Sequence, residues 1–201
     1  MVRNILGAVL VTAVTSTWAA DTLTKYESQL PCKVKVEGTS TIHDWAVNGQ
    51  IIVGEMELAE LKSMKPGKVP AKVAVRIPVR TLKSGNKLMD DIMYKAMNMQ
   101  KVKDIEYHLT ELVLKEAPAS ANGPFKFDST GELSVSGKTN KITMPVTMEM
   151  DGAKLKTTGA VPVKMTDYGI EPPAPKIGAG QIKTGDEVKL SFEWMTAPKA
   201  K

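Results

Sequence analysis

The sequence predicts an all-β fold, because apolar and polar residues alternate along most of its segments. In Lys141–Met150 the apolar side chains fall on one face of an extended chain and the others fall on the opposite face. Strands of this kind must bury their apolar faces together, as a sandwich or a closed barrel. Methionine is frequent on this inner face, and it is a flexible filler that tolerates an irregular occupant. The pattern therefore leaves open whether the interior is solid or holds a ligand.

Eight segments show the period-2 pattern, and one shows a helical pattern. The strands are expected at Lys33–Gly38, Asp44–Leu58, Val69–Val79, Asp104–Lys115, Phe125–Ser136, Lys141–Met150, Lys154–Met165 and Glu187–Met195. In Asn86–Met97 apolar residues recur at spacings of three and four, which predicts a short amphipathic helix. Asn86 or Ser84 is its expected N-cap. A lone helix among strands is expected to plug or cover one end of a barrel.

Turn and breaker residues indicate how the strands connect. The phase slips between Leu109 and Leu112, which predicts a β-bulge near Thr110–Glu111. Asp151-Gly152 predicts a tight hairpin between the strands Lys141–Met150 and Lys154–Met165. The segment 137–140 is expected to join the strands Phe125–Ser136 and Lys141–Met150. Glu171–Gly185 is rich in proline and glycine, which predicts a long loop.

Three prolines lie inside strand patterns, at Pro78, Pro145 and Pro162. Each removes a backbone donor, so we expect strand ends, bulges or gaps in the pairing there.

The N-terminus has the pattern of a secretory signal peptide. Arg3 gives a positive start, and Ile5–Val14 is an apolar run of the length of an export signal, too short to span a bilayer comfortably. We expect cleavage after Ala19, leaving residues 20–201 as one domain. Cys32 is the only cysteine, so no internal disulfide is possible, and we expect a small buried thiol near a strand start.

Charge and composition exclude some functions. The formal charge is +5, about +4 without Arg3, and the lysines are spread along the outward strand positions. Such a surface is compatible with weak attraction to an anionic membrane. Aromatic residues make up only 5% of the chain and no basic stripe alternates with them, so no nucleic-acid binding is predicted.

The two histidines offer little catalytic or metal chemistry. In a strand, His43 and Asp44 point to opposite faces, and no Gly-x-Ser-x-Gly motif is present, so a hydrolase using His43 is the least favoured alternative. Neither His43 nor His108 has a second ligand at metal-binding spacing, and no metal site is predicted. Met89, Met93 and Met97 form a row that suits Cu(I), but packing is the favoured interpretation.

Several motifs together resemble the YceI-like family of periplasmic polyisoprenoid-binding proteins. In chain order they are GTSTIHDW at 38–45, VRTLKSG at 79–85, Met89-Asp90 with Met93, GELSVSGKT at 131–139, Asp167–Ile170 and KTGDEVKLSF at 183–192. The resemblance implies an eight-stranded antiparallel barrel of lipocalin type with one short helix near a barrel end. It also implies a periplasmic protein with an isoprenoid lipid or quinone in the barrel lumen. Pro145 departs from the family, in which the proline stands at the start of that strand.

We therefore predict an exported, non-enzymatic carrier of a long isoprenoid-type chain, with no cofactor other than that ligand. The expected lining residues are Trp45, Val75, Ile77, Met93, Met97, Tyr107, Leu109, Leu133, Val135, Met144, Val146, Met148, Val163, Leu190 and Phe192. The expected partners are this hydrophobic molecule and, transiently, a membrane surface or a membrane protein, and the expected state is a monomer or homodimer. The alternative is a ligand-free interaction or stress-related protein with a solid core.

Overall fold

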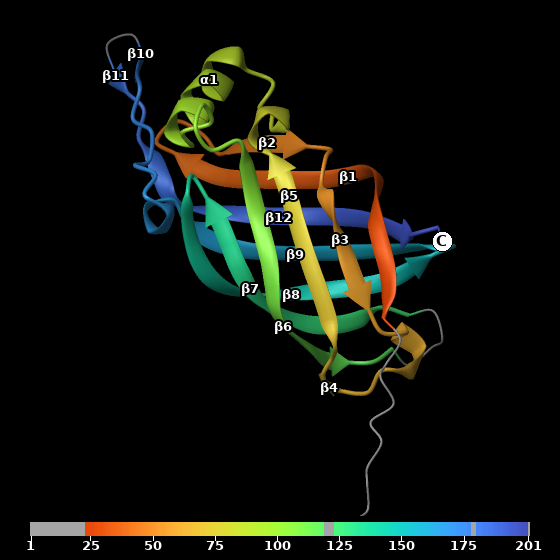
Figure 1. Cartoon of the computed structure of the whole chain (residues 1–201). Helices are drawn as coiled ribbons and strands as arrows, with labels where there is room; N and C mark the ends of the chain where they lie inside the picture. Colours follow the sequence, from red (N-terminus) through yellow and green to blue (C-terminus); the bar gives the residue numbers. More distant parts are fainter. Residues whose placement is uncertain (1–22, 119–122, 178–179, 201) are drawn as a thin grey trace, which may run out of the picture.

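Residues 23–118, 123–177 and 180–200 are described by the computed structural model, and they form strands and one α-helix, α1 (Lys87–Ala96) (Figure 1). The longer strands are β1 (Thr24–Ser40), β3 (Val53–Leu58), β5 (Ala71–Pro78), β6 (Asp104–Glu116), β7 (Phe125–Val135), β8 (Lys138–Asp151), β9 (Lys154–Lys164) and β12 (Thr184–Pro198). The shorter strands are β2 (Trp45–Gly49), β4 (Gly67–Lys68), β10 (Lys176–Ile177) and β11 (Gly180–Gln181).

The eight longer strands close into an antiparallel barrel. Their order around the barrel is β12-β9-β8-β7-β6-β5-β3-β1, and β12 pairs with β1 to complete the ring. Helix α1 and the β10–β11 hairpin lie at one end, and β4 lies at the other (Figure 1). The eight-stranded barrel with a helix at one end is therefore confirmed. None of the helices in the described part of the chain is long and apolar enough to cross a membrane.

The first two predicted strands differ from the structure. β1 begins at Thr24 rather than Lys33, because its pairing with β12 shifts register between Gln29 and Lys33 and the period-2 pattern is interrupted there. The predicted strand Asp44–Leu58 is two strands, since β2 pairs with one half of β1 and β3 pairs with the other. β2 and β3, separated by residues 50–52, thus pair one after the other along β1.

The inward alternation and the bulge are confirmed. In β8 the buried residues are Met144, Val146 and Met148, and in β6 buried positions shift phase from Tyr107 to Leu112. The β6–β7 register shifts between Leu109 and Glu111, where the bulge is expected.

Each of the two hairpin turns starts one residue away from its predicted start, and the first is also shorter than predicted. Val135 pairs with Lys138, so the β7–β8 turn is Ser136-Gly137 rather than 137–140, and both turn residues have positive φ, 52° and 84°. Asp151 pairs with Lys154, so the next turn is Gly152-Ala153. Part of the predicted loop Glu171–Gly185 also forms structure, because β10 pairs with β11 and β12 already begins at Thr184.

The three prolines lie at a strand end or in the gap of a ladder, as expected. Pro78 is the last residue of β5. The β8–β9 ladder stops at the pair Val146–Gly159, so Pro145 is the first residue of β8 beyond the ladder, and Pro162 lies inside the stretch of β9 that no longer pairs with β8. The short 3₁₀ turn Thr166–Tyr168 lies beside this seam, where Asn140 Nδ2 donates to the carbonyl of Asp167 at 2.9 Å. The predicted signal peptide, residues 1–19, lies outside the described residues.

Candidate functional site

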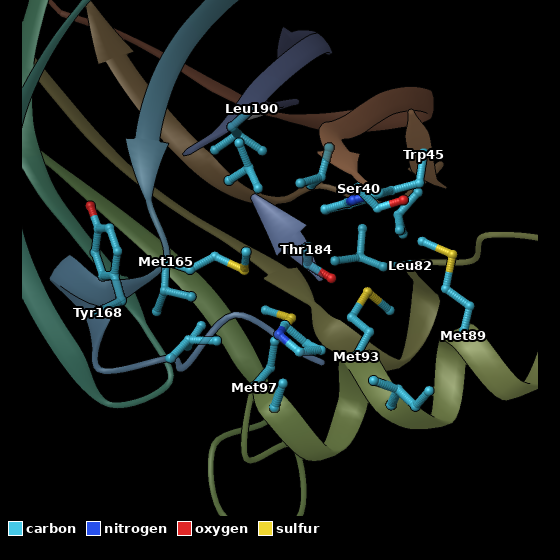
Figure 2. Close-up of a pocket in the computed structure, with 18 of the residues that line it drawn as sticks. Ser40, Trp45, Leu82, Met89, Met93, Met97, Met165, Tyr168, Thr184 and Leu190 are labelled. Carbon is cyan, nitrogen blue, oxygen red and sulfur yellow. The ribbon is translucent and has the colours of Figure 1, made fainter. Parts of the chain in front are cut away.

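A cavity of about 390 Å³ lies at the helix end of the barrel. Figure 2 shows Met89, Met93 and Met97 extending from α1 toward Leu82, Thr184 and Met165 on the facing elements. The strands β1, β2, β6, β7, β9 and β12 supply most of the remaining wall, together with the segment that follows β9. His43 and Leu88 line the cavity and are also exposed, so the cavity opens to solvent beside them.

Helix α1 forms the outer wall of this cavity because its apolar face turns inward. Asn86 is the N-cap, since its side-chain oxygen accepts a hydrogen bond from the backbone N–H of Met89 at 3.2 Å. The inward-facing residues include Met89, Met93 and Met97, as the helical spacing predicts. The helix therefore covers the barrel end and contributes much of the cavity wall.

Two polar side chains fasten α1 to the segment before it. The buried carboxylate of Asp90 accepts hydrogen bonds from the backbone N–H of Ser84 at 2.8 Å and from its hydroxyl at 2.7 Å, and Lys83 lies 3.5 Å away. The hydroxyl of Tyr94 donates to the carbonyls of Leu82 at 2.7 Å and Arg80 at 3.1 Å. Burial alone raises the pKa of Asp90, but the bonds from Ser84 and the charge of Lys83 outweigh it and hold the pKa below its ordinary value.

We expect Asp90→Ala to loosen α1 and to cost about 2 kcal/mol of stability, because it leaves the Ser84 donors without their charged acceptor. The folded-state pKa of Asp90 is the lower one, so this stabilisation is present above the unfolded carboxyl pKa of about 3.9 and is lost as the pH falls through the folded value. Denaturant unfolding and amide exchange of α1 as functions of pH measure the effect. Asp91→Ala, at an exposed position one residue along, is the control, and an equal loss there would contradict the role of Asp90.

A second cavity of about 80 Å³ lies deeper in the barrel. Ile105, Leu133 and Leu190 line both cavities, so the two lie end to end along the lumen. The wall of the deeper cavity is apolar apart from a few groups, among them the Tyr107 hydroxyl, which lies 2.8 Å from Ser129 Oγ. Burial raises the pKa of Tyr107, with a smaller opposing effect of Ser129, so this hydroxyl stays protonated at neutral pH.

All fifteen residues expected to line the lumen lie in the wall of one cavity or the other. The larger cavity has Trp45, Met93, Met97, Val135 and Val163, and Leu133 and Leu190 line both. The deeper cavity has Val75, Ile77, Tyr107, Leu109, Met144, Val146, Met148 and Phe192. Their positions agree with the expectation, and their contact with a ligand stays a prediction.

The sequence-based set misses the part of the wall that loops supply. Leu82 follows a 3₁₀ turn, Tyr168 and Ile170 follow β9, and Pro173, Pro175 and Ile182 come from the predicted loop. No periodicity marks these residues as inward-facing. The one available signal was the motif Asp167–Ile170, which belongs to the resemblance but was not assigned to the lumen.

His43 is bound to its own loop. Its Nδ1 lies 2.7 Å from the backbone oxygen of Asp44, not from the carboxylate. Ser40 Oγ donates to the carbonyl of His43 at 2.7 Å rather than to the ring. His43 therefore hydrogen-bonds the backbone of its own loop, and the arrangement does not resemble a Ser–His–Asp triad.

The remaining reactive groups of the described residues form no cluster. No three His, Cys, Asp or Glu side chains in that part of the chain lie close enough together to hold a metal ion. Cys32 is fully buried, as expected, although it lies within β1 rather than near its start, and its Sγ donates to the carbonyl of Gln29 at 3.2 Å.

The closed eight-stranded antiparallel barrel with an apolar lumen places this chain in the class of small, lipocalin-like β-barrels. Residues 22–195 match the YceI-like domain, so the chain belongs to the YceI-like family. No curated protein matches the sequence.

Solved structures with the same fold come from several bacteria. BcnA of Burkholderia cenocepacia is 19% identical with a TM-score of 0.61, and the match covers 82% of this chain and 95% of BcnA. A polyisoprenoid-binding domain from Saccharophagus degradans, implicated in plant cell wall breakdown, is 10% identical with a TM-score of 0.65, covering 88% and 99%. The YceI protein of Campylobacter jejuni is 14% identical with a TM-score of 0.55, covering 77% and 85%. At these identities the likeness concerns the fold.

Proposed function

We propose that this protein is an exported, periplasmic carrier that holds one long isoprenoid-type chain, such as a polyprenol or the tail of a quinone, in the barrel lumen. The observation that carries the proposal is the pair of apolar cavities that meet at Ile105, Leu133 and Leu190. The polyisoprenoid-binding domain among the structural relatives points in the same direction. In this proposal residues 1–19 direct export, the protein acts as a monomer or homodimer, and it exchanges its ligand during transient membrane contact.

The shape and chemistry of the lumen suit such a ligand. Burial of apolar surface contributes about 25 cal/mol per Å², so a chain of several isoprene units gains several kcal/mol without any polar partner along its length. Polar groups that can meet a head group lie at the mouth, where His43, Asn86, Lys164 and Thr184 line the larger cavity. A cavity of about 390 Å³ also disfavours the alternative of a barrel filled by its own side chains.

The first experiment is organic extraction of the purified protein followed by mass spectrometry. One stoichiometric lipid of isoprenoid mass would support the proposal and identify the ligand. An empty extract, together with a melting temperature that no added isoprenoid alcohol or quinone shifts, would contradict it.

A cavity-filling variant makes this test specific. Ala96 lies on α1 and lines the larger cavity, so we expect Ala96→Trp to occupy the space of the ligand and reduce bound lipid at least tenfold. Lys95→Trp adds the same side chain at the neighbouring exposed position and should leave the bound lipid unchanged. Equal lipid content in both variants, with both folded by circular dichroism, would show that the ligand does not use this cavity.

A further inference from the structure

We infer that the barrel end around the cavity mouth docks onto the surface of an anionic lipid bilayer. This inference rests on the carrier function proposed above, because it states where the ligand would enter and leave. It is carried by three features of the same end of the barrel: the open cavity, two exposed apolar side chains and a set of exposed basic residues, most of which form no ion pair with the described carboxylates.

The apolar feature consists of Ile42 and Leu88, which are 65% and 57% exposed. Leu88 lies in the first turn of α1 and lines the larger cavity. Ile42 lies between Ser40 and His43, both of which line the same cavity. The loop of Ile42 is held in place, since the backbone N–H of Thr41 donates to the carbonyl of Lys183 at 2.9 Å. Two large apolar side chains thus flank the opening through which a hydrophobic chain must pass.

The charge feature follows from the topology. The antiparallel order places four segments at the mouth end, 40–45, 79–104, 135–139 and 164–187, the last bounded by the pair Lys164–Glu187. They contain ten Lys and Arg residues against eight Asp and Glu, a net charge of +2, and all ten basic residues are exposed. The rest of the described chain also carries +2, from fifteen basic and thirteen acidic residues. The mouth therefore differs from the rest of the surface in the share of its basic groups that form no ion pair within the described chain, since elsewhere ten of the fifteen are paired.

Most of these basic groups are available to a partner. Asp90 and Asp91 pair with Lys83 and Lys87. Within the described ranges, no ion pair engages the other eight, which are Arg80, Lys95, Lys101, Lys103, Lys138, Lys164, Lys176 and Lys183. A lysine near an anionic bilayer strengthens binding about fivefold, within a screening length of about 8 Å at physiological salt.

A bilayer fits these features better than another anionic surface does. Insertion of Ile42 and Leu88 needs an apolar phase beneath the anionic layer, and a basic patch combined with a small apolar anchor gives reversible membrane binding. In this orientation the cavity faces the acyl chains, so a hydrophobic ligand passes between lumen and bilayer without crossing water.

Vesicle flotation tests the inference, using the chain from Ala20 onward so that the apolar run before it cannot bind lipid itself. We expect binding to vesicles of equal parts phosphatidylcholine and phosphatidylglycerol, weaker binding as salt rises, and no binding to phosphatidylcholine alone. The triple variant Lys95→Glu, Lys176→Glu, Lys183→Glu should bind at least about a hundredfold more weakly. Its control reverses three exposed lysines at the opposite end, in Lys62→Glu, Lys65→Glu, Lys154→Glu, and should bind nearly as well as the parent.

The apolar anchor has its own matched pair. Ile42→Ser with Leu88→Ser should weaken binding about tenfold or more, whereas Leu30→Ser with Met150→Ser, at two exposed apolar positions away from the mouth, should not. Failure of the parent to float, or equal losses in a variant and its control, would overturn the inference. Organic extraction of the same preparations separates the two proposals. Vesicle binding with an empty extract and no shift of the melting temperature by an isoprenoid would contradict only the carrier, and a lipid-filled protein that binds neither vesicle type would contradict only the docking surface.

Discussion

A chain carrying both Met144→Lys and Met148→Lys should fail to fold at neutral pH. Both methionines are buried in the lumen wall, and no carboxylate lines the deeper cavity beside them except Glu106, whose side chain is exposed. An unpaired charge in such a site costs several kcal/mol, and two of them approach the whole stability of a typical domain, about 5–15 kcal/mol. Circular dichroism and denaturant unfolding would show the loss.

The matched control introduces the same two lysines on the outer face of the same strand. Thr143→Lys with Thr147→Lys places the same two charges in the same strand, at the alternate positions that face away from the lumen, and should unfold within about 1 kcal/mol of the parent. The penalty of the inward pair should shrink as the pH rises through the lowered pKa of the buried amines, and its electrostatic part should be lost above the ordinary lysine pKa of about 10.4, where the neutral form predominates in both states. A folded, lipid-retaining inward variant at pH 7 would mean that β8 does not face the lumen.

The strand-borne part of the lumen was predictable because a strand has only two faces. Once Met144 is assigned inward, Val146 and Met148 must follow, and the same rule places Val163 and Leu190. The bulge in β6 was also readable, since the apolar phase changes within one strand between Leu109 and Leu112. These predictions depend on local alternation and need no knowledge of the partner strands.

The break between β2 and β3 could not be read in this way. It depends on how β1 changes its partner along its length, from β3 beside Thr24–Glu27 to β2 beside Val34–Gly38. Both halves keep an alternating pattern, so the segment 44–58 resembles one continuous strand. The register shift after Gln29 interrupts the alternating pattern of β1, so its first part could not be predicted from the sequence either.

The loop-borne wall is the other part that the sequence does not reveal. Pro173, Pro175 and Ile182 face the cavity only because the segment after β9 folds back over the mouth, where Lys183 meets Thr41. A proline- and glycine-rich loop carries no periodicity from which an inward face can be deduced. The seam between β8 and β9 is similar, since Pro145 and Pro162 predict a gap but not the 3₁₀ turn beside it.

We expect Gly131→Val to destabilise the barrel by about 3 kcal/mol or more, because the β6 bulge leaves no room for a side chain at this position. Gly131 pairs with Leu109, directly beside the register shift. A Cβ at Gly131 would lie 2.5 Å from Cζ of Tyr107 and closer still to the backbone oxygen of His108. The ring could move aside, but the strand backbone could not move without breaking the β6–β7 ladder. Denaturant unfolding measures the loss, with Glu132→Val, at the exposed neighbouring position, as the control.

A double variant identifies which contact matters. Tyr107→Leu removes the ring from above Gly131, so Gly131→Ala in that background tests the backbone contact alone. The oxygen of His108 stays in place in this background. We therefore expect Gly131→Ala to cost less stability with Leu at 107 than in the parent, but still to cost some. If Gly131→Ala costs no stability in the Tyr107→Leu background, the aromatic ring, rather than the bulged backbone of β6, is what requires glycine here. In that case the lumen at Tyr107 could be reshaped for other ligands by substitution of side chains alone.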